Sequence, residues 1–187
     1  MAIQLVKNAS ATIASNSLNN VLIGLGWRAG NSFDLDACVF MLSNNGRVVS
    51  DDYFIFFNQM QSPDGAVRHQ GDNLVGGTGQ NDDEQIHIDL SRVNQQVEKI
   101  VIAVSIYDAR TRGQNFGQIR SAYCRLVDQG SNEELMYFDL SEDYSYEISV
   151  VMGEIYRSGR DWHFRALGEG YQEEIDGLCR RYGVTVN

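Results

Sequence analysis

The sequence is poor in proline, cysteine and basic residues, and each shortage excludes a class of protein. A single Pro among 187 residues leaves no Pro-rich linker, so we expect one domain spanning residues 1–187. The three cysteines, Cys38, Cys124 and Cys179, are odd in number and lie in apolar runs, which indicates buried thiols rather than a disulfide framework. No apolar run approaches the roughly 18 residues of a membrane span, and the N-terminus lacks a signal-peptide pattern. The sequence therefore predicts a cytoplasmic protein with no direct membrane span.

Positive charge is scarce as well. The 15 Lys and Arg residues are outnumbered by 25 Asp and Glu, which gives a net charge of -10. Nucleic-acid phosphates are bound by clustered cations, so we exclude nucleic acid as a partner. In contrast, 43% of the residues are hydrophobic and 18 are Gly, which predicts a substantial core linked by tight turns.

Short apolar runs with a period of two dominate the chain and predict an all-β fold. Strands are expected at 3–7, 20–27, 34–42, 52–57, 84–90, 97–107, 119–127, 134–139, 146–157 and 162–167. The turn sequence Asn44-Asn45-Gly46 predicts that strand 34–42 pairs with the strand that follows it. Ten short strands joined by Gly, Asn and Ser turns predict a two-sheet β-sandwich.

A short helix is expected near the C-terminus. Apolar side chains recur there at helical spacing, preceded by acidic residues, followed by basic ones and ended by a glycine: Ile175, Leu178, Cys179 and Tyr182, with Glu173, Glu174, Arg180, Arg181 and Gly183. This order of charges complements the helix dipole, and the glycine suits the left-handed C-terminal position. We expect the helix to cover one edge or end of the sandwich.

An acidic, glycine-rich segment is the least typical part of the sequence. Residues 64–89 hold six acidic side chains and one basic one, Arg68, and so carry half of the net charge. Carboxylates, amides and main-chain carbonyls beside glycines are the ligands of Ca²⁺, which takes six to eight oxygens. Composition alone divides evenly between such a site and a solvated acidic loop.

A second acidic pair, Asp34 and Asp36, is separated by one residue on a predicted strand, so both carboxylates point to one face. The intervening residues Leu35 and Ala37 would point into the core. Burying unpaired charge is costly, so this pair needs a cation or a basic partner such as Arg28. Because the available ligands are almost all oxygen, they favour calcium or magnesium over zinc or copper.

Motifs along nearly the whole chain resemble the TerD family, the tellurium-resistance and stress-response proteins of bacteria. They are Gly24-Leu25-Gly26-Trp27, Phe33-Asp34-Leu35-Asp36-Ala37, Ser62-Pro63-Asp64-Gly65, Gly71-Asp72-Asn73-Leu74, Asp82-Asp83-Glu84, Gln114-Asn115-Phe116-Gly117-Gln118, Gly153-Glu154-Ile155-Tyr156-Arg157 and Gly168 to Tyr171. The resemblance implies a cytoplasmic, calcium-binding β-sandwich without established catalysis. It also implies partner proteins of the tellurium-resistance system, including a membrane-associated component, and a role in tolerance to tellurite, phage and colicins.

Carried over position by position, the resemblance implies acidic calcium-binding loops that hold one or two Ca²⁺ ions. The ligands would be Asp34, Asp36, Asp72, Asn73, Gly77, Gly79, Asp82, Asp83 and Glu84. This chain departs from the family pattern at Arg28, where an acidic residue is usual, and at Gln80 and Asn81 in the glycine loop. Less charge in that loop predicts that one of two sites is weaker.

Other polar and aromatic residues have simpler interpretations. Asp108 is expected to pair with Arg112, Asp64 to form a turn, and Glu154 to pair with Arg157 or Arg165. The aromatic cluster Tyr53, Phe54, Phe56 and Phe57 is interpreted as core. The leading hypothesis is thus a calcium-binding, non-enzymatic protein-interaction module; the alternatives are a calcium-dependent membrane-docking module and a metal-assisted hydrolase.

Overall fold

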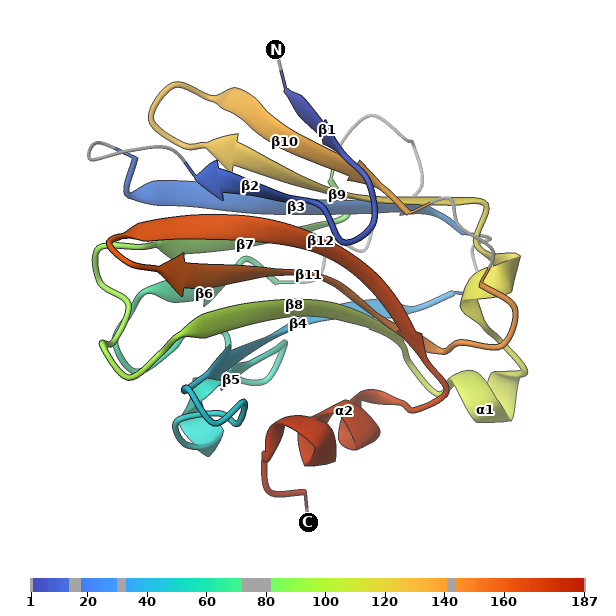
Figure 1. Cartoon of the computed structure of the whole chain (residues 1–187). Coiled ribbons are helices and arrows are strands. Elements are labelled where there is room, and N and C mark those ends of the chain that lie inside the picture. Colours follow the sequence, from blue (N-terminus) through green and yellow to red (C-terminus); the bar gives the residue numbers. More distant parts are fainter. Residues whose placement is uncertain (1, 14–17, 30–32, 72–81, 141–143, 187) are drawn as a thin grey trace.

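Two six-stranded sheets make up most of the described residues; the two-sheet arrangement is the predicted one, with twelve strands rather than ten. The computed structural model describes residues 2–13, 18–29, 33–71, 82–140 and 144–186. Sheet A has the strand order β1 (Ile3–Leu5), β10 (Glu133–Asp139), β9 (Ser121–Asp128), β3 (Asn20–Arg28), β7 (Glu84–Asp89) and β6 (Val67–His69). Sheet B has the order β2 (Ser10–Ile13), β12 (Asp161–Tyr171), β11 (Ser149–Ser158), β8 (Lys99–Ile106), β4 (Leu35–Leu42) and β5 (Phe54–Ile55). Figure 1 shows the sheets stacked face to face.

The core lies between the sheets because the strands alternate. In β7 the side chains of Glu84, Ile86 and Ile88 are buried and those between them are less so. The strand β4 is buried almost throughout, because one face meets sheet A and the other meets the C-terminal helix α2 (Ile175–Tyr182). The face of sheet B that points away from sheet A is therefore also packed, against α2, and forms a second and smaller layer (Figure 1).

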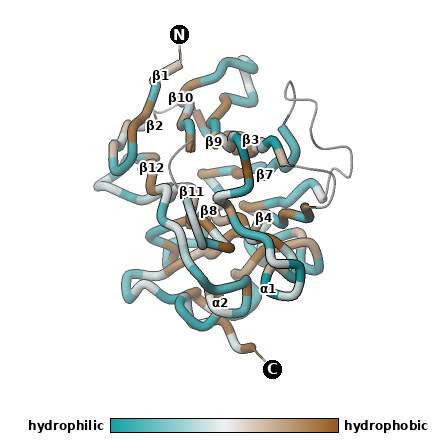
Figure 2. Tube along the Cα trace, turned by 90° about the vertical axis from the view of Figure 1, so that its right-hand side faces the viewer, coloured by the Kyte–Doolittle hydropathy of each residue, from teal (hydrophilic) through white to brown (hydrophobic). Residues whose placement is uncertain are grey.

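The helix α2 forms where the spacing of its apolar residues predicts it. Its buried side chains Leu178 and Cys179 lie against sheet B, and the ring of Tyr182 packs 4.7 Å from the ring of Phe40 in β4. Gly183 ends the helix with φ of +79°, the left-handed conformation expected there. Figures 1 and 2 place α2 and β1 on opposite sides of the sandwich.

Three short elements differ from the expectation. The strands β2 and β6 were not predicted; each is an edge strand of three or four residues, and each exists because it pairs with a longer neighbour. The expected strand at 52–57 is instead a 3-10 turn, Asp51–Tyr53, followed by the two residues of β5. The expected pairing of β4 with the next strand is confirmed, since Val39 and Phe40 face Ile55 and Phe54.

The connections at one end of the sandwich bring the acidic motifs towards each other. The helix α1 (Ala109–Arg112) follows β8 at this end, where β3 and β6 finish and β4 and β7 begin. We call this the acidic end. Within the described residues, no helix is long and apolar enough to cross a membrane.

Candidate functional site

Asp82, just before β7, is fully engaged by side chains of sheet A. Arg125 of β9 donates from Nε to Oδ1 at 2.7 Å and from Nη2 to Oδ2 at 2.8 Å. The hydroxyl of Tyr123 donates to Oδ1 at 3.0 Å, and the amide of Gln85 donates to Oδ2 at 3.1 Å. The carboxylate is completely buried, so this bidentate pair neutralises its charge within the protein.

The same cluster shifts the proton affinities of its members. The hydrogen bond to Asp82 raises the pKa of the Arg125 guanidinium above its already high value. Burial, and then the negative charge of Asp82, raise the pKa of the Tyr123 phenol well above its usual range. Arg125 therefore stays charged and Tyr123 stays a hydrogen-bond donor at neutral pH.

Two glycines of β3 make room for this cluster. A Cβ at Gly24 would collide with the carboxylate of Asp82, and one at Gly26 would collide with the ring of Tyr123. The Gly-x-Gly pattern before Trp27 thus lets Asp82 and Tyr123 lie close to the backbone of β3 on the outer face of sheet A.

Asp83 is held by the end of β3. Its main-chain N–H donates to the carbonyl of Leu25 at 2.7 Å, and its Oδ2 accepts from the main-chain N–H of Trp27 at 2.8 Å. The side chain is buried, with 7% of the residue exposed. Asp83 therefore fixes the start of β7 against β3.

Glu84 faces the space between the sheets and lies against His69. Its Oε2 is 3.4 Å from His69 Nε2, and both side chains are almost completely buried. His69 Nδ1 accepts a hydrogen bond from the main-chain N–H of Gly71, so the neutral ring carries its proton on Nε2. That nitrogen also lies 3.1 Å from the carbonyl oxygen of Ala37 in β4. His69 thus connects sheet A to sheet B beside Glu84.

The structure separates Asp36 from Glu84. Asp36 lines a surface hollow together with Phe54 of β5 and Ile175 of α2, on the side of sheet B that carries the helix. Glu84 lies on the other side of that sheet, near Ala37, the next residue of β4. Asp34 precedes β4 and is exposed, and its carbonyl accepts from the N–H of Tyr107.

The other predicted ligands, Asp72, Asn73, Gly77 and Gly79, lie outside the described residues. Within the ranges that the structure does describe, no three His, Cys, Asp or Glu side chains are placed to hold a metal ion together. The calcium site therefore remains a prediction.

Sequence reasoning missed Arg125, Tyr123 and His69 as neighbours of the acidic residues. Arg125 and Tyr123 lie 43 and 41 positions from Asp82 along the chain. His69 lies 15 positions from Glu84. The alternation of Tyr123 and Arg125 on β9 could have placed them on one face, but not opposite Asp82.

The cysteines offer no nucleophile. Burial raises the pKa of Cys38 well above its usual range, that of Cys124 to about 12 and that of Cys179 to about 11. All three are free thiols and remain protonated at neutral pH, whereas a reactive cysteine needs a lowered pKa.

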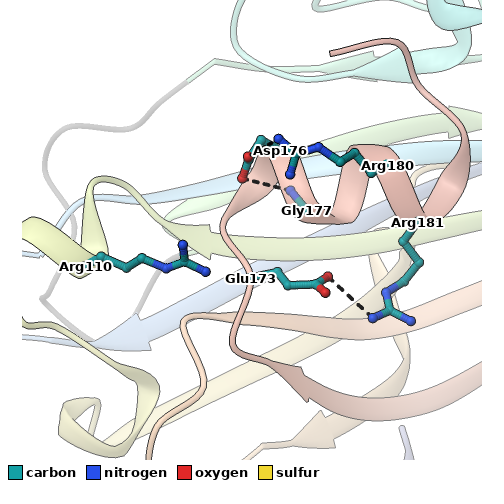
Figure 3. Close-up of a pocket in the computed structure, with 6 residues that line it drawn as sticks. All are labelled: Arg110, Glu173, Asp176, Gly177, Arg180 and Arg181. Atoms are coloured by element: carbon teal, nitrogen blue, oxygen red, sulfur yellow. Dashed lines mark hydrogen bonds and ion pairs between the residues drawn. The ribbon is translucent and has the colours of Figure 1, made fainter. Parts of the chain in front are cut away.

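A hollow of about 370 Å³ beside α2 carries several charges (Figure 3). Arg180 Nη2 lies 2.8 Å from Asp176 Oδ2, and Arg181 Nη2 lies 3.4 Å from Glu173 Oε2. Arg110, across the hollow, donates to the carbonyl of Gln172 at 3.0 Å. These arginines are engaged within the protein, so this hollow does not have the features of an anion site.

Comparison with known proteins agrees with the two-sheet fold and the motifs. Residues 1–182 match the TerD domain. The chain is 44% identical to the tellurium resistance protein TerD of Serratia marcescens and 40% identical to general stress protein 16U of Bacillus subtilis, each over all of both chains. A crystal structure of a TerD homologue from Streptomyces coelicolor superimposes with a TM-score of 0.70 at 18% identity, covering 91% of this chain and 100% of that one. This protein belongs to the TerD family of tellurium-resistance and stress-response proteins.

Proposed function

We propose that this protein is a calcium-binding, non-enzymatic stress-response protein whose metal-stabilised acidic end contacts partner proteins. Full-length relatives named for tellurium resistance and general stress support the biological role. The observation that carries the calcium proposal is the burial of two adjacent carboxylates of the acidic segment, Asp83 and Glu84, where β7 begins. Two neighbouring carboxylates repel each other, and a bound cation would reduce that repulsion.

The described donors fit a hard cation unequally. Asp83 and Glu84 supply carboxylate oxygens, the ligand type that calcium prefers. Asp82 fits less well, because both of its oxygens already accept from Arg125. In this proposal Asp82 anchors the acidic segment to sheet A, while Asp83 and Glu84 supply carboxylate ligands. When bound, the ion supplies the charge that offsets repulsion between the carboxylates.

Partner binding is the further part of the proposal. Ordering of the acidic end by metal would present a fixed surface to other proteins of the tellurium-resistance system, including a membrane-associated component. Neither membrane docking nor hydrolysis is favoured by a specific contact in the described residues.

Thermal unfolding tests the calcium proposal. A ligand that binds only the folded state adds about 2.7 kcal/mol at a hundredfold excess over Kd. For a chain of this length we expect calcium to raise Tm by about 5–10 °C over the chelated protein, and magnesium to raise it less. Differential scanning calorimetry in chelator, in calcium and in magnesium measures the effect.

Variants locate the effect. Asp83→Asn and Glu84→Gln should reduce the calcium-induced shift, each compared with its own chelated baseline. Asp161→Asn is the matched control, because Asp161 is exposed at the start of β12, next to the turn that follows β11 and away from the acidic end. Equal shifts in all three variants, or no shift in the parent protein, would contradict the proposal.

A further inference from the structure

An apolar hollow opens on the face of sheet B that carries α2, distinct from the contacts of Asp82, Asp83 and Glu84. It has a volume of about 270 Å³ and lies between the ends of β4 and β8, the segment around β5 and the start of α2. The lining residues that bear on its chemistry are Asp36, Phe56, Phe57, Tyr107, Asp108 and Glu174. This size lies just below the range of about 300–1,000 Å³ that is typical of small-ligand pockets.

Aromatic rings form one wall of this hollow. Phe54 and Phe56 stack at 4.6 Å, and Phe57 meets Phe56 edge-on at 5.2 Å with an interplanar angle of 80°. The planes of the Phe56 and Phe57 rings are thus nearly perpendicular. Phe57 is 45% exposed and Tyr107 is 54% exposed, although the sequence pattern placed Phe57 in the core. Exposed aromatic faces beside an apolar hollow are characteristic of a binding site rather than of a finished core.

Acidic side chains complete the lining. Asp36, Asp108 and Glu174 come from three separate segments, whereas no Lys or Arg is among the described residues that line the hollow. Glu174 is oriented by the main-chain N–H of Arg110, which donates to its Oε1 at 3.2 Å. The hollow therefore combines ring faces, which attract cations, with carboxylates of complementary charge.

The rim already accommodates one cation of the protein itself. The guanidinium of Arg112 lies 5.3 Å from the centre of the Tyr107 ring, and its Nε lies 3.9 Å from Asp108 Oδ2. The same ring and carboxylate thus contact a positive charge outside the hollow.

We propose that this hollow binds the alkylammonium group of a small organic molecule. The rings of Phe56 and Phe57 would surround the alkyl groups on nitrogen, and Asp108 and Glu174 would face the positive charge. Ammonium groups carrying alkyl substituents suit such a site because they combine apolar surface with delocalised charge. The two carboxylates that the proposal uses, Asp108 and Glu174, are not predicted calcium ligands, although Asp36, which also lines the hollow, is one.

Choline and its neutral isostere 3,3-dimethylbutan-1-ol provide the probe pair, since they share a shape and differ in charge. Isothermal titration of the full chain should give measurable binding of choline and at least tenfold weaker binding of the alcohol. Equal affinity for the two, or no binding of choline, would overturn the proposal.

Two substitutions examine the two components. Phe57→Leu keeps apolar volume but removes a ring face, and should weaken choline binding about threefold to tenfold. The pair Asp108→Asn and Glu174→Gln together should abolish the preference for choline; Asn also tolerates the left-handed backbone of Asp108, with φ of 51°. Tyr146→Leu is the control for loss of an exposed ring elsewhere and should leave binding unchanged.

A short peptide bearing trimethyllysine separates a free small molecule from a partner's side chain. Tighter binding of the peptide than of choline would overturn the assignment to a small molecule. All of these variants retain every predicted calcium ligand, so failure here is distinguishable from failure of the calcium proposal. Far-UV circular dichroism and Tm of each variant establish that its fold is intact, and an unfolded Phe57→Leu would be replaced by Phe57→Met.

Discussion

At the scale of single residues, the ion pair of Asp82 and Arg125 is the best-defined feature of the acidic end. The carboxylate is fully buried, while the guanidinium side chain is 31% exposed. Removing one partner of such a pair leaves a buried charge uncompensated, which costs more than the pair contributes. The pair therefore fixes the start of β7 to β9, and we expect its loss to destabilise sheet A.

Arg125→Met should lower the free energy of unfolding by about 3 kcal/mol, because Asp82 would remain buried without its main counter-charge. The double variant with Asp82→Asn should recover part of this loss. Urea unfolding followed by Trp fluorescence measures both values. A loss below about 1 kcal/mol for the single variant would show that the pair behaves like an exposed surface ion pair.

Other residue-level expectations have mixed outcomes. The pair of Asp108 and Arg112 is confirmed, with 3.9 Å between Oδ2 and Nε. Asp64 does form a turn, accepting from the N–H of Ala66, but it also accepts from the N–H of Asn94, thirty positions away. Glu154 pairs with Arg165 as expected, and its other partner is Lys99 rather than Arg157. The long-range partners could not be read from local spacing.

At the scale of elements, the helix α2 shows how far local sequence determines structure. Its start, its charges and its terminal glycine agree with the pattern, because capping and dipole effects act within one turn. The strands β2 and β6 were missed for the opposite reason. Three or four residues carry too little periodicity, and their hydrogen bonds depend on β12 and β7.

Gly183→Ala should destabilise the protein by about 1–2 kcal/mol, because a Cβ is strained at φ of +79° and would also press on Arg47. Gly183→Asn should cost less, since Asn tolerates the left-handed region. Thermal unfolding of the two variants measures the difference. If Ala and Asn cost the same, backbone strain is not the cause.

At the scale of the whole molecule, three buried thiols couple stability to alkaline pH. They are distributed over both layers: Cys124 in sheet A, Cys38 in β4 and Cys179 in α2. Burial raises the pKa of each above the ordinary value of 9.0. Above about pH 9 the unfolded thiols release protons that the folded protein still holds.

Stability should therefore fall as pH rises from about 9 towards 12, because the unfolded state binds fewer protons across that window. For Cys124, whose pKa is raised to about 12, the contribution of the buried thiol to stability should be fully present below pH 9 and lost progressively above it. Cys124→Ala should flatten the decline. Urea midpoints measured from pH 8 to 11 check the slope, and identical slopes in the variant and the parent would exclude this thiol as a source.

The sequence by itself determined the two-sheet class, the C-terminal helix, the burial of the cysteines and the family, because periodicity, capping and motif order act locally or along the chain. The tertiary structure decided which charges meet. Asp82 meets Arg125 because β7 and β9 pair with opposite edges of β3, and Asp36 faces α2 because strand alternation turns it away from Glu84. Such pairings depend on strand register and on which face each side chain takes, and both are set only when distant segments pack.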